Sequence, residues 1–141
     1  MATDSTNSWV YDIQDAIYSR LDAICDAKLG QKYSDLNVTM DSHKVTNAKF
    51  PSVYVHFLSP VEVGSDLDGK DVNAIYLTAN ITVTVTSAQG MEVAKEVTQI
   101  VTDCMKDMRF VASLSEFVDT DTEYRTVSRF ARTIGNADTL F

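Results

Sequence analysis

The sequence predicts an α+β fold in which two long helices lie on one face of a mostly antiparallel sheet of about four strands. Two stretches repeat apolar residues at helical spacing, and four stretches have strand patterns, in the order α-β-β-β-α-β. The chain has 141 residues, of which 45% are hydrophobic, enough for one ordinary core. We expect a flexible arm over residues 1–8, a single two-layer domain over 9–135 and a tail over 136–141.

The first helix is predicted over residues 9–28. Ser8 suits the N-cap position and Gly30 suits the residue that ends a helix. Between them the apolar positions recur every three or four residues and form one stripe, with acidic residues mainly on the other side. The stripe consists of Val10, Ile13, Ile17, Leu21 and Ile24.

Two strands are expected next. Residues 36–40 alternate apolar and polar side chains, the period of a short half-buried strand. Residues 41–49 are polar and predict a loop. A β-branched and aromatic run, residues 53–58, follows Pro51, which we expect at the first position of this strand, and the strand should end near Pro60.

The longest strand is predicted over residues 75–86, with apolar side chains at odd positions and mainly Thr at even ones. At about 3.4 Å per residue it would be about 40 Å long, twice the usual length. It follows a loop, residues 59–71, that carries Glu62, Asp66, Asp68 and Asp71. We therefore expect the strand's tip and this acidic loop to project as a hairpin arm that a neighbouring molecule covers.

The second helix is predicted over residues 91–108, where apolar side chains form a wide stripe. A loop with four acidic residues between positions 116 and 123 should follow, and then a last strand over residues 124–134. That strand contains Arg125 and Arg129 on one face and Arg132 on the other. Two interpretations stay open: cross-strand pairing with Thr and acidic side chains, or contacts with carboxylates of an adjacent subunit.

Charge and composition exclude several classes of function. The net charge is −8, which disfavours a phosphate-binding surface because nucleic-acid affinity needs clustered Lys and Arg. Cys25 and Cys104 fall on apolar helix faces and predict buried free thiols, as in a reducing cytosol. Without a long apolar run or a leader, we expect a soluble intracellular protein.

No residue pattern predicts catalytic, cofactor-binding or metal-binding chemistry. Gly64, Gly69 and Lys70 have the spacing of a phosphate-cradling loop, but Asp71 replaces its hydroxyl residue and a strand follows where a helix is needed. His43 and His56 have no second ligand at zinc spacing, and no nucleophile has a local signature. We expect neither an enzyme nor a cofactor.

The order of elements and several short strings resemble tail terminator proteins of long-tailed bacteriophages, also called tail completion or minor tail proteins. The strings include KFPSV at residues 49–53 and YRTVSRF at 124–130. The resemblance covers residues 9–135. It implies a virion protein, assembled in the host cytoplasm, that forms a ring, usually a hexamer. Such a ring caps the head-proximal end of the tail tube, stops tube polymerisation and docks on the head–tail connector protein, while DNA passes through without specific binding.

No site residue transfers from this family, so the interface candidates come from charge and position. They are Glu62, Asp66, Asp68, Asp71, Arg125, Arg129 and Arg132, expected at subunit contacts or in the lumen. An acidic lumen would repel the DNA backbone and let it slide. The alternatives are another connector component, such as a head-closure or adaptor protein, and then a small cellular binding module or an enzyme.

Overall fold

The computed structural model describes residues 9–40, 50–65, 72–113, 116–119 and 122–135. Its elements are α1 (Trp9–Leu29), β1 (Asn37–Thr39), β2 (Ser52–Phe57), β3 (Val61–Ser65), β4 (Val72–Thr86), α2 (Gly90–Asp107), β5 (Val111–Ala112), β6 (Glu116–Asp119) and β7 (Glu123–Gly135). The predicted arm at residues 1–8, the loop at 41–49 and the tail at 136–141 lie outside the described residues.

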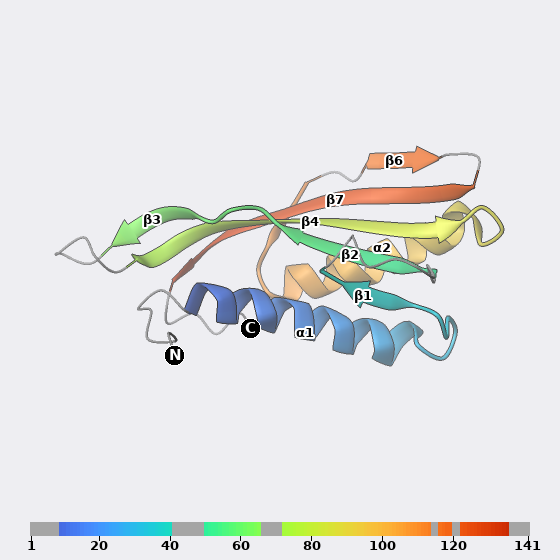
Figure 1. Ribbon diagram of the computed structural model, residues 1–141, viewed down its shortest axis with the longest axis horizontal. Helices are drawn as coiled ribbons and strands as arrows, with labels where there is room; N and C mark the ends of the chain where they lie inside the picture. Colours follow the sequence, from blue (N-terminus) through green and yellow to red (C-terminus); the bar gives the residue numbers. More distant parts are fainter. Residues whose placement is uncertain (1–8, 41–49, 66–71, 114–115, 120–121, 136–141) are drawn as a thin grey trace.

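The fold is α+β, as predicted, with two helices and one sheet (Figure 1). The sheet has seven strands in the order β1-β2-β4-β7-β5, with β3 added to β4 and β6 added to β7. It is mixed, because β1 pairs with β2 in parallel while the other pairings are antiparallel. The expectation of about four strands in the order α-β-β-β-α-β was therefore wrong in number.

The three additional strands are β3, β5 and β6. The sequence analysis assigned β3 to the loop over residues 59–71 and β6 to the acidic loop before the last strand. Each is two to five residues long and bonds on one side to a much longer strand. The formation of such a short strand depends on the long neighbouring strand with which it pairs, and that neighbour is not evident from the local sequence.

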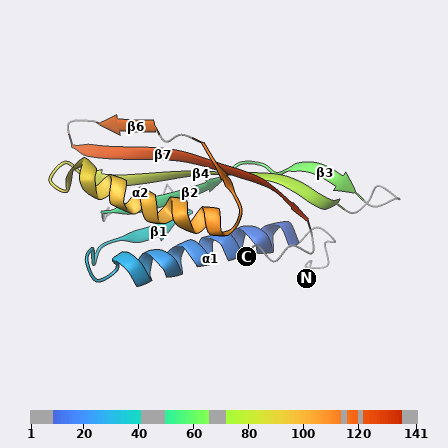
Figure 2. The same ribbon diagram turned by 180° about the vertical axis from the view of Figure 1, so that it is seen from behind.

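Both helices lie against the same face of the sheet (Figures 1 and 2). On β4 the residues at odd positions, from Ile75 to Val85, are buried, whereas the even ones are half-buried or exposed. The Thr-rich side of β4 is thus turned away from the helices. We call this side of the sheet the open face.

The first helix follows its predicted stripe. Ile17 and Leu21 are fully buried, and the stripe continues through Cys25 to Leu29. Gly30 follows the last helical residue, and a Cβ atom there would lie 2.5 Å from the carbonyl oxygen of Asp26. Only glycine fits such a close approach, so its place at the end of α1 is fixed by packing.

The second helix is held at both ends by local geometry. At its start, the Gln89 side chain accepts a hydrogen bond from the Thr86 backbone N–H (3.1 Å), and Gly90 has a φ of 83° that favours glycine. Beyond its end, Arg109 adopts a φ of 69°, and its N–H donates to the Lys106 carbonyl oxygen at 2.8 Å. Arg109 therefore takes the left-handed position that usually belongs to glycine after a helix.

The hairpin formed by β3 and the start of β4 reaches one end of the molecule, beyond the first residues of α1 (Figure 1). Its strands are antiparallel, with Val61 opposite Tyr76 and Ser65 opposite Val72. β7 accompanies β4 from Glu123 up to Gly135, which lies opposite Ala74. We call β3 and its partner residues 72–76 the hairpin arm.

Candidate subunit interface

The predicted acidic candidates are only partly within the described residues. Glu62 lies on β3 in the hairpin arm and is exposed, opposite Ile75 of β4. Because Ile75 faces the helices, Glu62 is on the helix side of the arm. Asp66, Asp68 and Asp71 lie outside the described residues.

The Arg residues of β7 divide between the two faces as predicted. Arg125 and Arg129 are exposed on the open face, and both bind within the chain. Arg129 Nε donates to Asn80 Oδ1 at 3.0 Å, and Arg125 Nη2 lies 3.1 Å from Glu123 Oε1. Arg129 thus has a cross-strand partner that is an Asn, and Arg125 has an acidic partner on its own strand, whereas the first interpretation named Thr and acidic partners across the strands.

Arg132 lies on the helix side and contributes to the end of α2. Its Nη1 donates to the Met108 carbonyl oxygen at 2.5 Å, and its guanidinium lies 5.9 Å from the centre of the Phe110 ring. A guanidinium in this position satisfies a carbonyl group that the end of a helix leaves without an intrahelical partner. Arg132 therefore has a structural role within the chain.

The hairpin arm also carries an apolar cluster that was not among the predicted site residues. Val61, Val63 and Tyr76 are 58%, 52% and 43% exposed. Val61 and Tyr76 are opposite each other on the open face, and Val63 lies two residues further along β3, beside a register shift. The Val61-Glu62-Val63 alternation was the available signal, hidden within a segment that its acidic residues made look like a loop. We call these three residues the arm patch.

A second set of exposed apolar residues lies along the opposite edge of the sheet. Phe117 and Val118 on β6 are 55% and 42% exposed, and Val111 on β5 is 73% exposed. Phe117 is opposite the buried Thr126 and so faces the helix side, where the Lys95 ammonium of α2 lies 5.8 Å from its ring centre. Val118 is opposite Arg125 on the open face.

Net charge within the secondary structure is concentrated on the helices. Each helix carries four acidic and two basic residues, so each contributes a net charge of −2. The acidic residues were expected to concentrate in two loops, over residues 59–71 and 116–123. The helix layer is therefore a second acidic surface, and its acidic side chains include Asp12, Asp15, Asp22, Asp26, Glu92, Glu96, Asp103 and Asp107.

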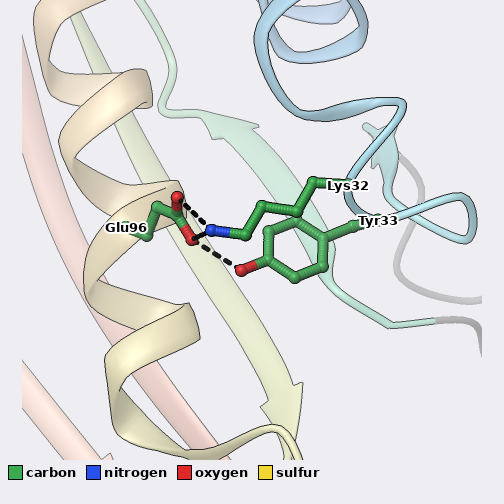
Figure 3. Close-up of polar contacts among 3 residues, drawn as sticks. All are labelled: Lys32, Tyr33 and Glu96. Atoms are coloured by element: carbon green, nitrogen blue, oxygen red, sulfur yellow. Dashed lines mark hydrogen bonds and ion pairs between the residues drawn. The ribbon is translucent and has the colours of Figure 1, made fainter.

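A three-residue polar cluster joins the segment after α1 to α2 (Figure 3). Glu96 Oε1 accepts a hydrogen bond from Tyr33 Oη at 2.5 Å, and Glu96 Oε2 lies 2.9 Å from Lys32 Nζ. Hydrogen bonds from Tyr33 and Lys32 lower the pKa of Glu96, and the bond to Glu96 raises the pKa of both partners. The cluster connects two elements on the helix side of the sheet.

The two cysteines are buried free thiols, as predicted. Burial raises the pKa of Cys25 to about 12 and also raises that of Cys104. Cys25 borders a cavity of about 240 Å³ beside β1, whose other lining residues include Asp22, Asp26 and Tyr33 but no Lys, Arg or His. A thiol held in its protonated form beside carboxylates is a poor nucleophile.

In the described ranges no three His, Cys, Asp or Glu side chains come together as metal ligands. No helix of the described chain is both long and apolar enough to span a membrane. Comparison with protein-family models finds no match, and neither does a search of curated proteins.

Proposed function

We propose that this protein is a structural virion component that forms a ring, of six copies as in tail terminators, at the head-proximal end of a phage tail tube. In this function it ends tube polymerisation and offers the surface on which the head–tail connector docks. The proposal rests on the resemblance stated above and on a molecular surface suited to assembly.

The arm patch is the observation that carries the proposal. Val61, Val63 and Tyr76 expose apolar surface on the hairpin arm, and the opposed pair Val61 and Tyr76 lies on the open face, which the helices of the same chain do not cover. A free strand edge with exposed apolar side chains favours pairing with another chain. A second molecule therefore provides the cover that this part of the fold lacks.

The distribution of charge fits the passage of DNA through such a ring. The helix layer carries a net charge of −4 from its two helices, and Glu62 adds another acidic side chain on the same side of the sheet. A channel bordered by acidic side chains repels phosphates and so does not retain DNA. We propose that the helix layer borders the lumen.

Electron microscopy of tail tubes polymerised with and without the protein tests the function. We expect rings at one end of each tube and tubes that stop growing when the protein is added. A variant in which Val61 and Val63 are both replaced by Ser should leave tube growth unchecked, while Asp15→Ser on α1 should act like the wild type. Tubes that grow to the same length with and without the protein would refute the terminator function. Rings that bind the connector and never the tube would indicate a head-closure or adaptor protein instead.

A further inference from the structure

We propose that β3 of one copy pairs antiparallel with β6 of the next copy, so that the sheet continues from subunit to subunit. The partner is thus a second copy of this chain, held by its opposite edge. This inference rests on the proposed ring and specifies which surfaces form its contacts.

The first observation is that β3 and β6 lie on opposite sides of the sheet and, among the described residues, each bonds to one strand only. β3 bonds to β4 on one side of the sheet, and β6 bonds to β7 on the other. In the described part of the chain neither strand has a partner on its outer edge. Residues Glu116–Asp119 of β6 are all exposed. Two such edges are templates for main-chain hydrogen bonds with another molecule.

The second observation is the direction of the two strands. β3 is antiparallel to β4, β4 is antiparallel to β7, and β7 is antiparallel to β6. Within one sheet β3 and β6 therefore run in opposite directions. When the sheet continues into a second copy with both helix layers on the same side, β3 meets β6 antiparallel.

The third observation is that side chains match on both faces in one antiparallel register. With Val61 opposite Val118, both valines lie on the open face, where each is exposed in the single chain. Glu62 then lies opposite Phe117 on the helix side. An apolar cross-strand pair such as Val61 and Val118 stabilises neighbouring strands beyond their backbone hydrogen bonds.

Charge supports the same register. The Lys95 ammonium lies 5.8 Å from the Phe117 ring centre, so a carboxylate opposite Phe117 comes close to this cation. Glu62 of the neighbouring copy supplies that carboxylate from the helix side of its arm. Opposite charges across an interface favour this register, whereas like charges oppose it.

The contact joins two different surfaces of the chain. In a pair of copies, the copy that uses β3 still has a free β6, and the copy that uses β6 still has a free β3. A head-to-tail contact of this type produces a closed ring or an open filament, in contrast to a two-fold dimer in which one surface meets itself. A ring that caps a tube requires such a head-to-tail contact between its subunits.

Cysteine crosslinking tests the pairing directly. The double variant Val61→Cys/Val118→Cys places thiols on directly opposite residues, whose Cα atoms would be about 4.5–5.5 Å apart, within the range of a disulfide. Under oxidation we expect a ladder of covalent oligomers on a non-reducing gel. Each single variant should give no ladder, because its thiol faces a valine in the neighbouring copy, and the native Cys25 and Cys104 are buried. Crosslinked dimers from a single variant would show a two-fold contact and overturn the proposal.

A charge exchange between Glu62 and Lys95 provides the second part of the test. We expect Glu62→Lys and Lys95→Glu each to weaken association by about tenfold through like-charge contacts, and the double variant to regain most of the loss. Asp15→Lys and Lys106→Glu, exposed charges elsewhere on the two helices, are the matched controls. The measurement is sedimentation equilibrium, or the occupancy of tube ends if the free protein is monomeric.

The outcomes separate this inference from the function on which it rests. Rings or capped tubes with neither a disulfide ladder nor rescue by the double variant would overturn the strand pairing and leave the terminator function in place. No ring and no tube capping by the wild-type protein would overturn both.

Discussion

Thr98 of α2 and Thr126 of β7 hydrogen-bond to each other through their hydroxyl groups in the buried space between helix and sheet. Both residues are buried, at 8% and 0% exposure. A hydroxyl that loses its partner in such a place keeps its desolvation cost without the compensating bond. The pair therefore fixes the position of α2 on the sheet through its hydroxyls as well as through packing.

We expect Thr98→Val and Thr126→Val each to lower the free energy of unfolding by about 1–3 kcal/mol, because each leaves one buried hydroxyl without a partner. The double variant should be less destabilised than the sum of the two, since it removes both hydroxyls together. Urea unfolding of the four proteins measures this coupling. Strictly additive effects would show that the two hydroxyls act independently.

The left-handed backbone at Arg109 predicts that glycine at this position is more stable than alanine. Arg109→Gly should make the protein more stable than Arg109→Ala by about 1 kcal/mol, because both lose the side chain and only glycine adopts a φ of 69° without strain. Thermal unfolding of the two variants compares them directly. Equal melting temperatures would mean that the backbone at this position relaxes in both proteins.

The Lys32–Tyr33–Glu96 cluster predicts a pH dependence with two limits. The lowered pKa of Glu96 means that its contribution is present above the ordinary carboxyl value of 4.5 and is lost as the pH falls through the folded pKa. The raised pKa values of Tyr33 and Lys32 mean that their contributions are present below 10.0 and 10.5, respectively, and are lost as the pH rises through the folded pKa.

We therefore expect the stability difference between the wild type and Glu96→Gln to be largest near neutral pH and to shrink at both extremes. The effect should be small, because exposed ion pairs contribute little. Glu92→Gln, an exposed acid in the first turn of the same helix, is the control. A difference that stays constant from acid to alkaline pH would contradict this account of the cluster.

Arg129→Ala tests the role of the open face. The bond to Asn80 is exposed and uses one donor of a guanidinium that has five, so we expect its loss to cost the single chain about 0.5–1 kcal/mol. Under the second interpretation Arg129 contacts a carboxylate of an adjacent subunit, and on that interpretation we predict a larger effect on association between copies than on unfolding. Equal effects on unfolding and on association would leave Arg129 with cross-strand pairing alone.

The sequence predicted best those helices and strands that are long enough to show a periodic pattern of apolar residues by themselves. The stripe of α1 and the alternation of β4 and β7 depend on burial along a single long element, so periodicity located them within a few residues. The parallel pairing of β1 with β2 and the addition of β3 and β6 depend on residues distant in sequence. Local patterns do not contain that information.

The candidate site was predictable to a similar extent. A projecting hairpin was expected from the length of one strand, and Arg125 and Arg129 were placed on the correct common face. The apolar arm patch was missed because its valines flank Glu62 in an acidic segment. Arg132 was grouped with the interface candidates, yet the turn after α2 brings the Met108 carbonyl within its reach, a contact that strand alternation alone does not reveal.

The mass of the assembled protein, measured with and without the arm patch, tests the central claim most directly. We predict that the wild type forms rings of six 15.6 kDa chains, alone or on tail tubes. The triple variant Val61→Ser/Val63→Ser/Tyr76→Ser should remain monomeric in both conditions with a nearly unchanged melting temperature, because these side chains are exposed in the single chain. A wild-type protein that stays monomeric at low and high salt and on tail tubes, or a triple variant that assembles as the wild type does, would contradict the account.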